Sequence, residues 1–295
     1  MHWKNLLDKP EAVLQSWPHE PLLNRHGPSK FDELVTLAEV ERLIEYDCLP
    51  MHNLRLVKGG KVVAKTDYSE GDILRRGALR QHLAVGDTLQ IRSIETLLPS
   101  IRILCDDLRV DTGYETRAHA FLTPPGRRGL HRHYDSHVTL VLQIAGHKVW
   151  PVYRPFVKDP VRNYQSFPLM GFTREQEILM ETTAPYSTYI LKPGDVLWLP
   201  RGWIHSPYTE RDESSLHITV NIIECTNHRL AEMVAQAALR KSLADDRLRL
   251  EIPPAQMTGD PIPVIKEVRG YLIGALEALD AEEIAAVVRE ELRRS

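Results

Sequence analysis

The chain has 295 residues, of which 43% are hydrophobic and 26% charged, as expected for one large globular domain or a domain with a smaller appendage. Its formal net charge of −3 gives no strong nucleic-acid signal, and no apolar run is long enough to predict a membrane span. The isolated cysteines Cys48, Cys105 and Cys225 predict reduced, mostly buried thiols, and no signal-peptide pattern is visible, so we expect a cytoplasmic protein.

Residues 1–116 predict a mixed α/β region that packs on a β-rich core. The apolar spacing and early acidic residues of 31–47 predict a helix. Residues 54–65 predict a hairpin that turns on Gly59 and Gly60. Residues 91–110 predict a helical stretch around Pro99.

Residues 117–224 have a different character, with short apolar or alternating runs separated by proline and glycine. Many short strands at this spacing predict an antiparallel sandwich or barrel. Residues 225–295 return to helical patterns, interrupted by the proline-rich segment "IPPAQMTGDPIP". Asp280 followed by Glu283 predicts a capping box at the start of the last helix.

The stretch "LHRHYDSHV" gathers three histidines and an aspartate directly before an apolar run. Read as a strand, it places His131, His133, Asp135 and His137 on one face, which either contacts water or forms the wall of a metal site. Two histidines and one carboxylate hold one face of a non-haem Fe(II) ion and leave the other positions open. His133 and Asp135 can both reach one ion, and the third ligand must come from a distant strand.

His205 is the candidate for that third ligand. It lies in "KPGDVLWLPRGWIHS", where a turn at Gly194 leads into an apolar strand over 196–199, which Pro200 and Gly202 then bend. The spacing G-x5-P-x-G-x2-H is far more specific than a lone histidine. His131 and His137 have no predicted role, because a single histidine in an apolar neighbourhood is usually a hydrogen-bonded core residue.

The run "SLHITVNII" alternates polar and apolar residues. His217, Thr219 and Asn221 share one face of this predicted strand, which either faces water, the commoner case, or lines a wet interior beside the metal site. A nucleophilic site is not supported, because Ser136 and Ser206 lie in no elbow motif and Cys225 has no matched base.

"FLTPPGRRGLHRHYDSHVTLVLQIAGHKVWPVY", "LKPGDVLWLPRGWIHS" and "SLHITVNI" together resemble the JmjC-type oxygenases of the ribosomal oxygenase group, and "WPHEPLL" near the start resembles their N-terminal segment. The resemblance implies a mainly β fold with flanking helices. Its core would be a double-stranded β-helix of the cupin or jelly-roll type over 117–224, followed by a C-terminal helical region over 225–295 without a full winged helix.

The resemblance also implies a ligand set. His133, Asp135 and His205 would bind Fe(II), with 2-oxoglutarate and O2 as co-substrates. Lys148 would pair with the distal carboxylate of 2-oxoglutarate, as a partly buried dicarboxylate needs a cation; without the resemblance, a surface hairpin lysine would be the simpler interpretation. Asn221 would lie near the co-substrate. The sequence differs from the family pattern at two positions near the co-substrate. His119 stands where relatives carry Asn, and Phe121 stands where they carry Tyr, so that a hydroxyl donor is missing.

The expected activity is hydroxylation of an amino-acid side chain, with Arg or His favoured, in a protein or peptide, while 2-oxoglutarate is decarboxylated to succinate. N-methyl demethylation and hydroxylation of a free amino acid or biosynthetic peptide use the same chemistry and stay open. A metal-binding cupin without turnover is the alternative outside enzymes, motivated by His119 and Phe121; retention of the whole triad argues against it.

Two further regions have alternative interpretations. Residues 154–172 carry Arg162, Tyr164, Phe167 and Phe172, which suit peptide capture or a lid packed on the barrel. The C-terminal helices predict a homodimerisation module or, nearly as well, a cap on the same monomer.

Overall fold

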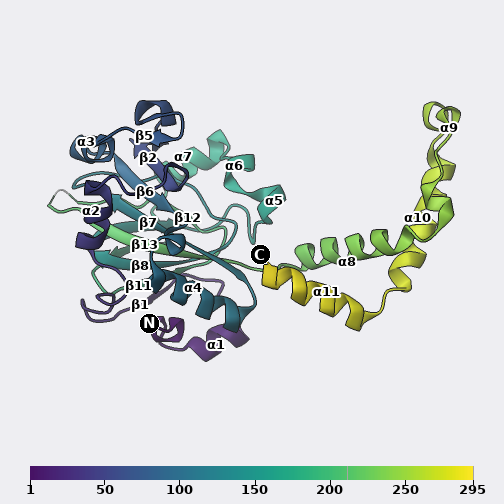
Figure 1. Cartoon of the computed structure of the whole chain (residues 1–295), viewed down its shortest axis with the longest axis horizontal. Coiled ribbons are helices and arrows are strands. Elements are labelled where there is room, and N and C mark those ends of the chain that lie inside the picture. The colour runs from purple at the N-terminus through teal and green to yellow at the C-terminus, as the bar shows by residue number, and fades with distance from the viewer. Residues whose placement is uncertain (211, 295) are drawn as a thin grey trace. The chain divides into compact units, whose positions relative to one another are not determined.

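The computed structural model describes residues 1–210 and 212–294, without the side chains of 292–294. The chain divides into two compact units, residues 1–224 and 225–295, whose elements follow in order along the chain (Figure 1). The predicted division into three parts, at 116/117 and 224/225, stays a prediction, and residue 295 of its last part lies outside the described residues. Within the described residues, no helix is both long and apolar enough to cross a membrane.

The strands of the described chain all belong to the first unit. They are β1 (Leu22–Asn24), β2 (Leu54–Lys58), β3 (Lys61–Val62), β4 (Ser69–Glu70), β5 (Ile73–Leu74), β6 (Thr88–Arg92), β7 (Glu115–Thr123), β8 (Val138–Ala145), β9 (Lys148–Tyr153), β10 (Ser187–Leu191), β11 (Val196–Leu199), β12 (Ile204–His205) and β13 (Ser215–Ile223).

Helices occur in both units. The α-helices are α1 (Pro10–Gln15), α2 (Leu37–Glu45), α3 (Ala78–Ala84), α4 (Pro99–Thr112), α5 (Arg162–Gln165), α6 (Phe167–Met170), α7 (Arg174–Thr182), α8 (Asn227–Ser242), α9 (Pro254–Thr258), α10 (Ile262–Glu277) and α11 (Ala281–Arg294). The 3-10 helices are η1 (Trp3–Leu6), η2 (Met51–Asn53), η3 (Lys65–Asp67), η4 (Ile94–Thr96) and η5 (Asp246–Arg249).

Among the described residues, β4 and β5 form a separate pair, and the other strands form two antiparallel sheets: one of eight strands in the order β1-β11-β8-β13-β7-β6-β2-β3 and a smaller one in the order β10-β9-β12. Side chains of β9 reach the large sheet: Lys148 donates a hydrogen bond to Thr123 of β7, and the ring of Trp150 contacts that of His217 on β13. The two sheets therefore face one another across a shared interior. This arrangement confirms the predicted cupin-type core.

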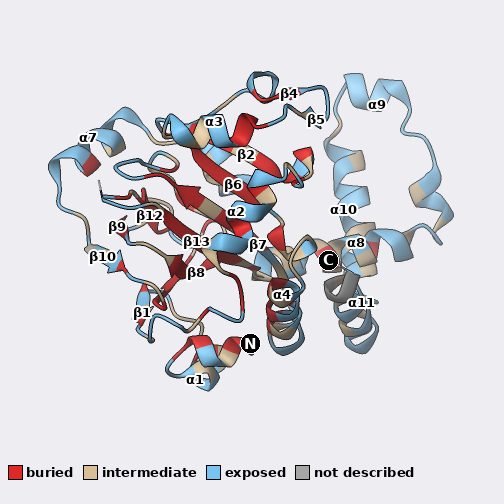
Figure 2. Cartoon of the chain, turned by 60° about the vertical axis from the view of Figure 1, so that its left-hand side comes forward, coloured by how far each residue is buried: buried red, intermediate tan, exposed pale blue. Residues whose placement is uncertain are grey.

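The large sheet is apolar on one face and polar on the other, and both faces of β13 are buried (Figure 2). On the apolar face, Ile218 and Val220 of β13 belong to the main hydrophobic core, together with Ile101 and Leu104 of α4. The side chains of β13 alternate between the faces, so His217, Thr219 and Asn221 point into the interior. The predicted polar face of this strand is thus the wall of a site rather than a solvent-exposed surface.

Local signals explain where two predicted helices differ from the observed ones. The helix expected over 31–47 begins only at Leu37, because Thr36 and Glu39 form a capping box there. The helical stretch expected over 91–110 is wrong before residue 94, since β6 extends to Arg92; the α-helix starts at Pro99, which occupies the first turn. The hairpin on Gly59 and Gly60 is confirmed by the pairing of β2 with β3.

The second unit is helical within its described residues. Helices α10 and α11 both contact α8, and α9 lies inside the proline-rich segment that separates two of the predicted helices. Asp280 caps α11, since its Oδ1 accepts hydrogen bonds from the backbone N–H groups of Glu282 and Glu283 at 2.8 and 3.0 Å. Much of this unit's helical surface, α9 and α10 above all, is exposed (Figure 2).

Candidate metal centre

The segment that carries His133 and Asp135 is a loop, which is hydrogen-bonded through its backbone to the segment that carries His205. Only His133 makes a β-bridge, with His205, so the prediction of a strand through residues 131–137 is wrong and β8 begins at Val138. The N–H of each bridge histidine donates to the carbonyl of the other at 3.1 and 2.9 Å, and Gly202 N–H donates to the Asp135 carbonyl at 2.8 Å. Backbone pairing therefore brings the two motifs together across about 70 residues of sequence.

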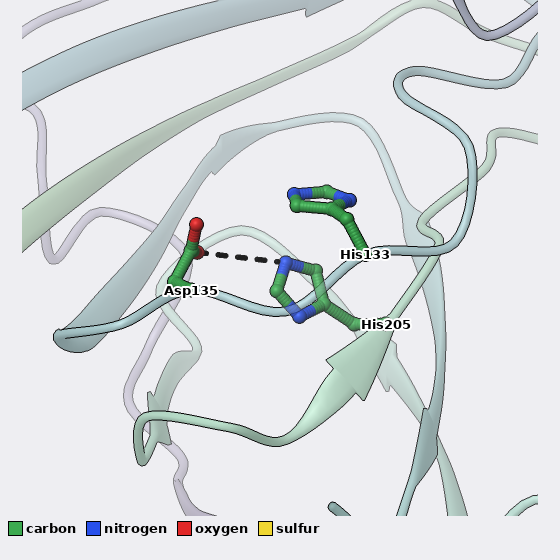
Figure 3. A group of neighbouring side chains, drawn as sticks. All are labelled: His133, Asp135 and His205. Carbon is green, nitrogen blue, oxygen red and sulfur yellow. Dashed lines mark ion pairs between the residues drawn. The ribbon is translucent and has the colours of Figure 1, made fainter. Parts of the chain in front are cut away.

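Figure 3 shows His133, Asp135 and His205 converging from these two segments. One potential ligand atom from each residue lies within 4.8 Å of the other two. His205 Nε2 is 3.7 Å from Asp135 Oδ2, with the histidine side chain 5% exposed and the aspartate 31%. The three predicted ligands thus form one group, and its open side is next to the aspartate.

Backbone carbonyls orient both histidine rings. His133 Nδ1 lies 2.8 Å from the carbonyl of His131, and His205 Nδ1 lies 3.0 Å from the carbonyl of Trp203. A carbonyl can only accept, so each Nδ1 carries the proton and each Nε2 keeps its lone pair. Both rings are consequently in the tautomer that presents Nε2 to an ion.

The electrostatics of the group favour a bound cation. Burial alone would raise the pKa of Asp135, but His137, His133 and His205 around it lower that pKa to about 2. Burial and the neighbouring His133 lower the pKa of His205 to about 4. At neutral pH Asp135 is therefore a carboxylate and His205 a neutral imidazole, the protonation states that metal binding requires of these two ligands.

This donor set fits Fe(II). Two imidazole nitrogens and one carboxylate oxygen on one side of a site match the facial arrangement of non-haem iron centres, whereas structural zinc sites are closed by four ligands. His133, Asp135 and His205 supply three donors among the described residues, so further positions would remain open for small ligands.

The side chain of Lys148 lies between the two sheets, away from solvent. It is 1% exposed, and Nζ donates to Thr123 Oγ1 at 2.7 Å and lies 3.3 Å from His217 Nδ1. Burial lowers the pKa of Lys148 to about 7, and burial together with Lys148 lowers that of His217 well below its usual value, so His217 is neutral. Lys148 is therefore no surface hairpin residue, and among the described residues it pairs with no carboxylate.

Asn221 is connected to the triad through Thr139. Thr139 Oγ1 donates to Asn221 Oδ1 at 3.3 Å and lies 3.4 Å from Asp135 Oδ2, and Asn221 and Thr139 are opposite one another in the pairing of β13 with β8. Asn221 thus lies beside the metal group and helps to hold the threonine that contacts Asp135.

His119 and Phe121 both project from β7 toward the polar face. His119 Nδ1 accepts a hydrogen bond from the Ser93 N–H at 3.0 Å, and burial, followed by His137, lowers the pKa of His119 to about 4. Its ring is therefore neutral, with the proton on Nε2. Phe121 stacks on His217 with ring centroids 4.9 Å apart and planes 3° from parallel.

The two histidines without a predicted role differ in position. The His131 side chain is exposed, and its ring lies against Gly60, where an added Cβ would come within 2.6 Å of it. Its contribution to the site is the backbone carbonyl that orients His133. His137 is partly buried, and its Nε2 has no hydrogen-bond partner among the described residues.

Sequence reasoning overlooked Thr123 and Trp150. Thr123 is fully buried on β7 and accepts the Lys148 hydrogen bond, and the Trp150 ring lies between His205 and His217, with centroids at 5.6 and 5.4 Å. The alternation of β9 signals Trp150, which projects on the same face as Lys148 two positions earlier. Nothing in the local sequence distinguishes Thr123 from the other threonines.

The segment 154–172 packs its aromatic residues beside the metal group. Phe167 and Phe172 join a cluster with Tyr134 and Ile204, whose neighbours in sequence are the ligands, and Tyr134 OH donates to the Gln165 carbonyl at 2.9 Å. The rings of His133 and Phe167 are 6.2 Å apart. These contacts are those of a packed lid, while Arg162 and Tyr164 remain on its exposed surface.

The three cysteines are free, as predicted, but only Cys105 is buried. Burial raises the pKa of the Cys105 thiol to about 12, which makes it unreactive. Cys48 is exposed and Cys225 partly buried, so the expectation that the thiols are mostly buried is wrong.

Comparisons with known proteins agree with this geometry. The JmjC domain family matches residues 96–230. The chain is 28% identical over 238 residues to a protein of Drosophila willistoni named bifunctional lysine-specific demethylase and histidyl-hydroxylase NO66, a match that covers 75% of this chain and 29% of that protein. It is 31% identical over 177 residues to the protein of the same name from Drosophila persimilis, covering 58% and 24%. The matches thus span less than a third of these relatives.

The fold is similar to that of the ribosomal oxygenase YcfD from Escherichia coli. Its structure with cobalt and succinic acid has a TM-score of 0.60 and 17% identity, over 93% of this chain and 68% of that one. The structure with cobalt and 2-oxoglutarate has a TM-score of 0.58 and 17% identity, over 97% and 70%. At this identity the likeness shows the fold. Together with the domain match and the His133, Asp135 and His205 group, it shows that this chain is a cupin-fold protein that contains a JmjC domain.

Proposed function

We propose that this chain is an Fe(II)- and 2-oxoglutarate-dependent hydroxylase that acts on an amino-acid side chain, with Arg or His favoured, in a protein or peptide. The observation that carries the proposal is the buried cation of Lys148, which pairs with no carboxylate among the described residues. An unpaired buried charge is costly unless a partner of opposite charge joins it. A dicarboxylate co-substrate would bring that partner.

The residues of the site divide the work between them. His133, Asp135 and His205 would hold Fe(II) through Nε2 atoms and a carboxylate oxygen. Lys148 and Thr123 would bind the distal carboxylate of 2-oxoglutarate, with Lys148 taking a full proton as the pair forms. When bound, iron would supply an oxidation in which O2 converts 2-oxoglutarate to succinate and CO2, with one oxygen atom going into succinate and the other into a substrate C–H bond.

The surrounding side chains would position the co-substrate and exclude water. The rings of Phe121 and Trp150 flank His217 beside Lys148 and give this end of the interior an apolar wall. His119, with its proton on Nε2, is a donor next to the position of the hydroxyl that Phe121 lacks. We infer that His119 and Asn221 contact the co-substrate or its immediate neighbours.

The substrate assignment follows from relatives. The relatives in Drosophila are named histidyl-hydroxylases, and YcfD is described as a ribosomal oxygenase. These descriptions favour a protein substrate, and the lid over 154–172 could contribute peptide contacts through exposed Arg162. Demethylation of lysine is the second candidate, since the same relatives carry that name as well. Mass spectrometry of a treated peptide separates the two: hydroxylation adds one oxygen atom, and demethylation removes a methyl carbon.

The first test is anaerobic. Fe(II) and then 2-oxoglutarate are added to metal-free protein, and the visible charge-transfer absorption of the complex is recorded for the wild type, Lys148→Ala and His205→Ala. We expect a band in the wild type and none in either variant. If the wild type binds iron but shows no band even at saturating 2-oxoglutarate, the hydroxylase proposal is wrong, and the chain is a metal-binding cupin without oxygenase chemistry.

We also propose that the second unit mediates homodimerisation. A helix of a soluble protein rarely exposes a continuous apolar stripe, yet Ile262, Ile265, Val268, Ile273 and Leu276 of α10 are all 37–59% exposed at roughly helical spacing. Light scattering of the full chain should give the dimer mass, and Ile265→Glu with Ile273→Glu should give the monomer. A monomeric wild type would contradict this proposal.

A further inference from the structure

The polar face of the large sheet continues beyond the co-substrate end of the interior. Strand register places Phe121 opposite His217 on one side and opposite Gln90 on the other, and Gln90 opposite Arg55. Opposite residues in antiparallel strands project on the same face. One row of side chains therefore runs from His217 through Phe121 and Gln90 to Arg55.

Phe121 divides this row into two parts. Its ring lies flat on His217, the neighbour of Lys148, so the His217 side is the part assigned to 2-oxoglutarate. On the other side of Phe121 the row contains an amide and a guanidinium, which the proposed reaction does not yet use.

Arg55 is a partly buried cation that interacts with the Tyr68 hydroxyl group but has no carboxylate partner among the described residues. On the neighbouring strand β6, another cation, Arg92, lies diagonally across from Arg55, two positions beyond its partner Gln90. Burial, followed by Arg92, lowers the pKa of Arg55. Arg92 lies exposed at the rim, where it donates to the His52 carbonyl at 3.2 Å and likewise lacks a carboxylate partner. Two guanidinium groups that repel each other are thus held together on the polar face of the large sheet.

Gln90, next to both arginines, has a hydrogen-bond acceptor without a donor. Its side chain is 5% exposed, and its Oε1 has no hydrogen-bond partner among the described residues. A buried carbonyl without a donor is costly, so this oxygen favours a ligand that carries N–H groups.

The row lies close to the metal group. Arg92 is opposite His119 of β7, and His119 is opposite Thr219 of β13, two positions before Asn221, which lies beside the metal group. The loop that carries His133 contacts the same two strands near their other end, since His131 N–H donates to the Gly60 carbonyl just after β2 at 3.3 Å and Thr88 Oγ1, at the start of β6, donates to the Arg128 carbonyl at 3.4 Å. A substrate that reaches the open side of the triad could therefore contact this row.

We propose that Arg55, Arg92 and Gln90 form a substrate subsite that binds a carboxylate of a peptide, with Gln90 accepting from an N–H of the same peptide. The inference rests on the proposed function, because it assigns the anion to the substrate and leaves Lys148 to the co-substrate. A carboxylate matches the fork of Arg55 with two parallel hydrogen bonds. The acceptor on Gln90 favours a peptide over a phosphate ligand, which offers no N–H group.

The test uses the full chain and a defined set of probes. These are fluorescein-labelled, amidated pentapeptides with a central His or Arg, each with Glu at one other position, and matched peptides with Gln there. Binding is measured by fluorescence polarisation at low salt for the wild type, Arg55→Gln and Arg92→Gln. Arg42→Gln, an exposed arginine on α2 away from the row, is the matched control. Binding of 2-oxoglutarate to each Fe(II)-loaded variant is measured in parallel and reports that the site is folded.

We expect at least one Glu peptide to bind about ten-fold more tightly than its Gln match, as for a charge-assisted pair. Arg55→Gln should bring that ratio close to one, Arg92→Gln should reduce it about three-fold because this residue is exposed, and Arg42→Gln should leave it unchanged. Ratios near one throughout the wild-type set, or a ratio that survives Arg55→Gln, would overturn the subsite.

The 2-oxoglutarate measurement separates this inference from the proposed function. If the wild type binds no 2-oxoglutarate but the Glu preference disappears in Arg55→Gln, the oxygenase proposal fails and the peptide subsite stands. If Arg55→Gln loses 2-oxoglutarate while Lys148→Ala keeps it, the arginine row holds the co-substrate and the subsite proposal is wrong.

Discussion

The two faces of the large sheet are both buried, but they are buried for different reasons. On the apolar face, Ile218 and Val220 pack in the main core, where burial stabilises the fold. On the polar face, His217 is just as inaccessible as Lys148, which approaches it from β9 of the smaller sheet, yet burial lowers both their pKa values and so works against their charged forms. Substitutions on one face should therefore cost stability, and substitutions on the other should cost binding.

The largest effect should follow from Ile218→Ala. This side chain is fully buried between Ala120 and Leu142, its partners on the neighbouring strands. Removing its buried carbons should lower the free energy of unfolding by about 2–5 kcal/mol, as measured by urea denaturation. Iron affinity of the folded fraction should not change; a matching loss of iron affinity would show that the two faces are not separable.

His205→Ala should have the opposite effect: a large loss of iron affinity and little change in the free energy of unfolding. It removes one of three ligand donors, so iron affinity should fall by more than about 100-fold, beyond the loss caused by changing a residue that only supports a ligand. The free energy of unfolding without metal should fall by only about 1 kcal/mol, since the His205 ring is neutral and the substitution removes one hydrogen bond, to the Trp203 carbonyl. His131→Ala is the matched control: it keeps the backbone carbonyl that orients His133, and its iron affinity should equal that of the wild type.

Lys148→Met should separate stability from binding most clearly. Methionine has a similar length without the charge, so the free energy of unfolding of the ligand-free protein should rise by about 1–3 kcal/mol. Binding of 2-oxoglutarate, measured by calorimetry, should be lost. A destabilised Lys148→Met protein would mean that the lysine supports the fold and not the co-substrate.

The smallest effect is a pH dependence of 2-oxoglutarate affinity. Burial lowers the pKa of Lys148 to about 7 in the free protein, and a bound carboxylate would raise it toward its ordinary value. The complex then holds more protons than the free site, so affinity should fall by up to about tenfold for each pH unit above 7 and stay level, for this group, below 7. Calorimetry between pH 6 and pH 9 in buffers of different ionisation enthalpy would detect the proton uptake. Lys148→Arg should lose this slope, because arginine stays protonated throughout.

The metal ligands were predictable because they lie in two motifs of demanding spacing, and the JmjC resemblance named Lys148 as well. The alternation of "SLHITVNII" also predicted the polar and apolar faces of β13, since side chains alternate along any strand. The prediction of a strand through His131 and His137 is wrong because a loop can show the same alternation of residue types as a strand. The backbone conformation there depends on the bridge between His133 and His205, which the local sequence does not show.

The sequence alone thus determined the fold class, the metal donors and the two-faced strand, all of which depend on local spacing or on motifs. The tertiary structure decided what those faces contact. It placed His217 and Thr123 around Lys148, stacked Phe121 on His217, and aligned Gln90 and Arg55 beyond it. These neighbours come from strands far apart in the chain, and register between strands follows from packing the whole core, which no single segment contains.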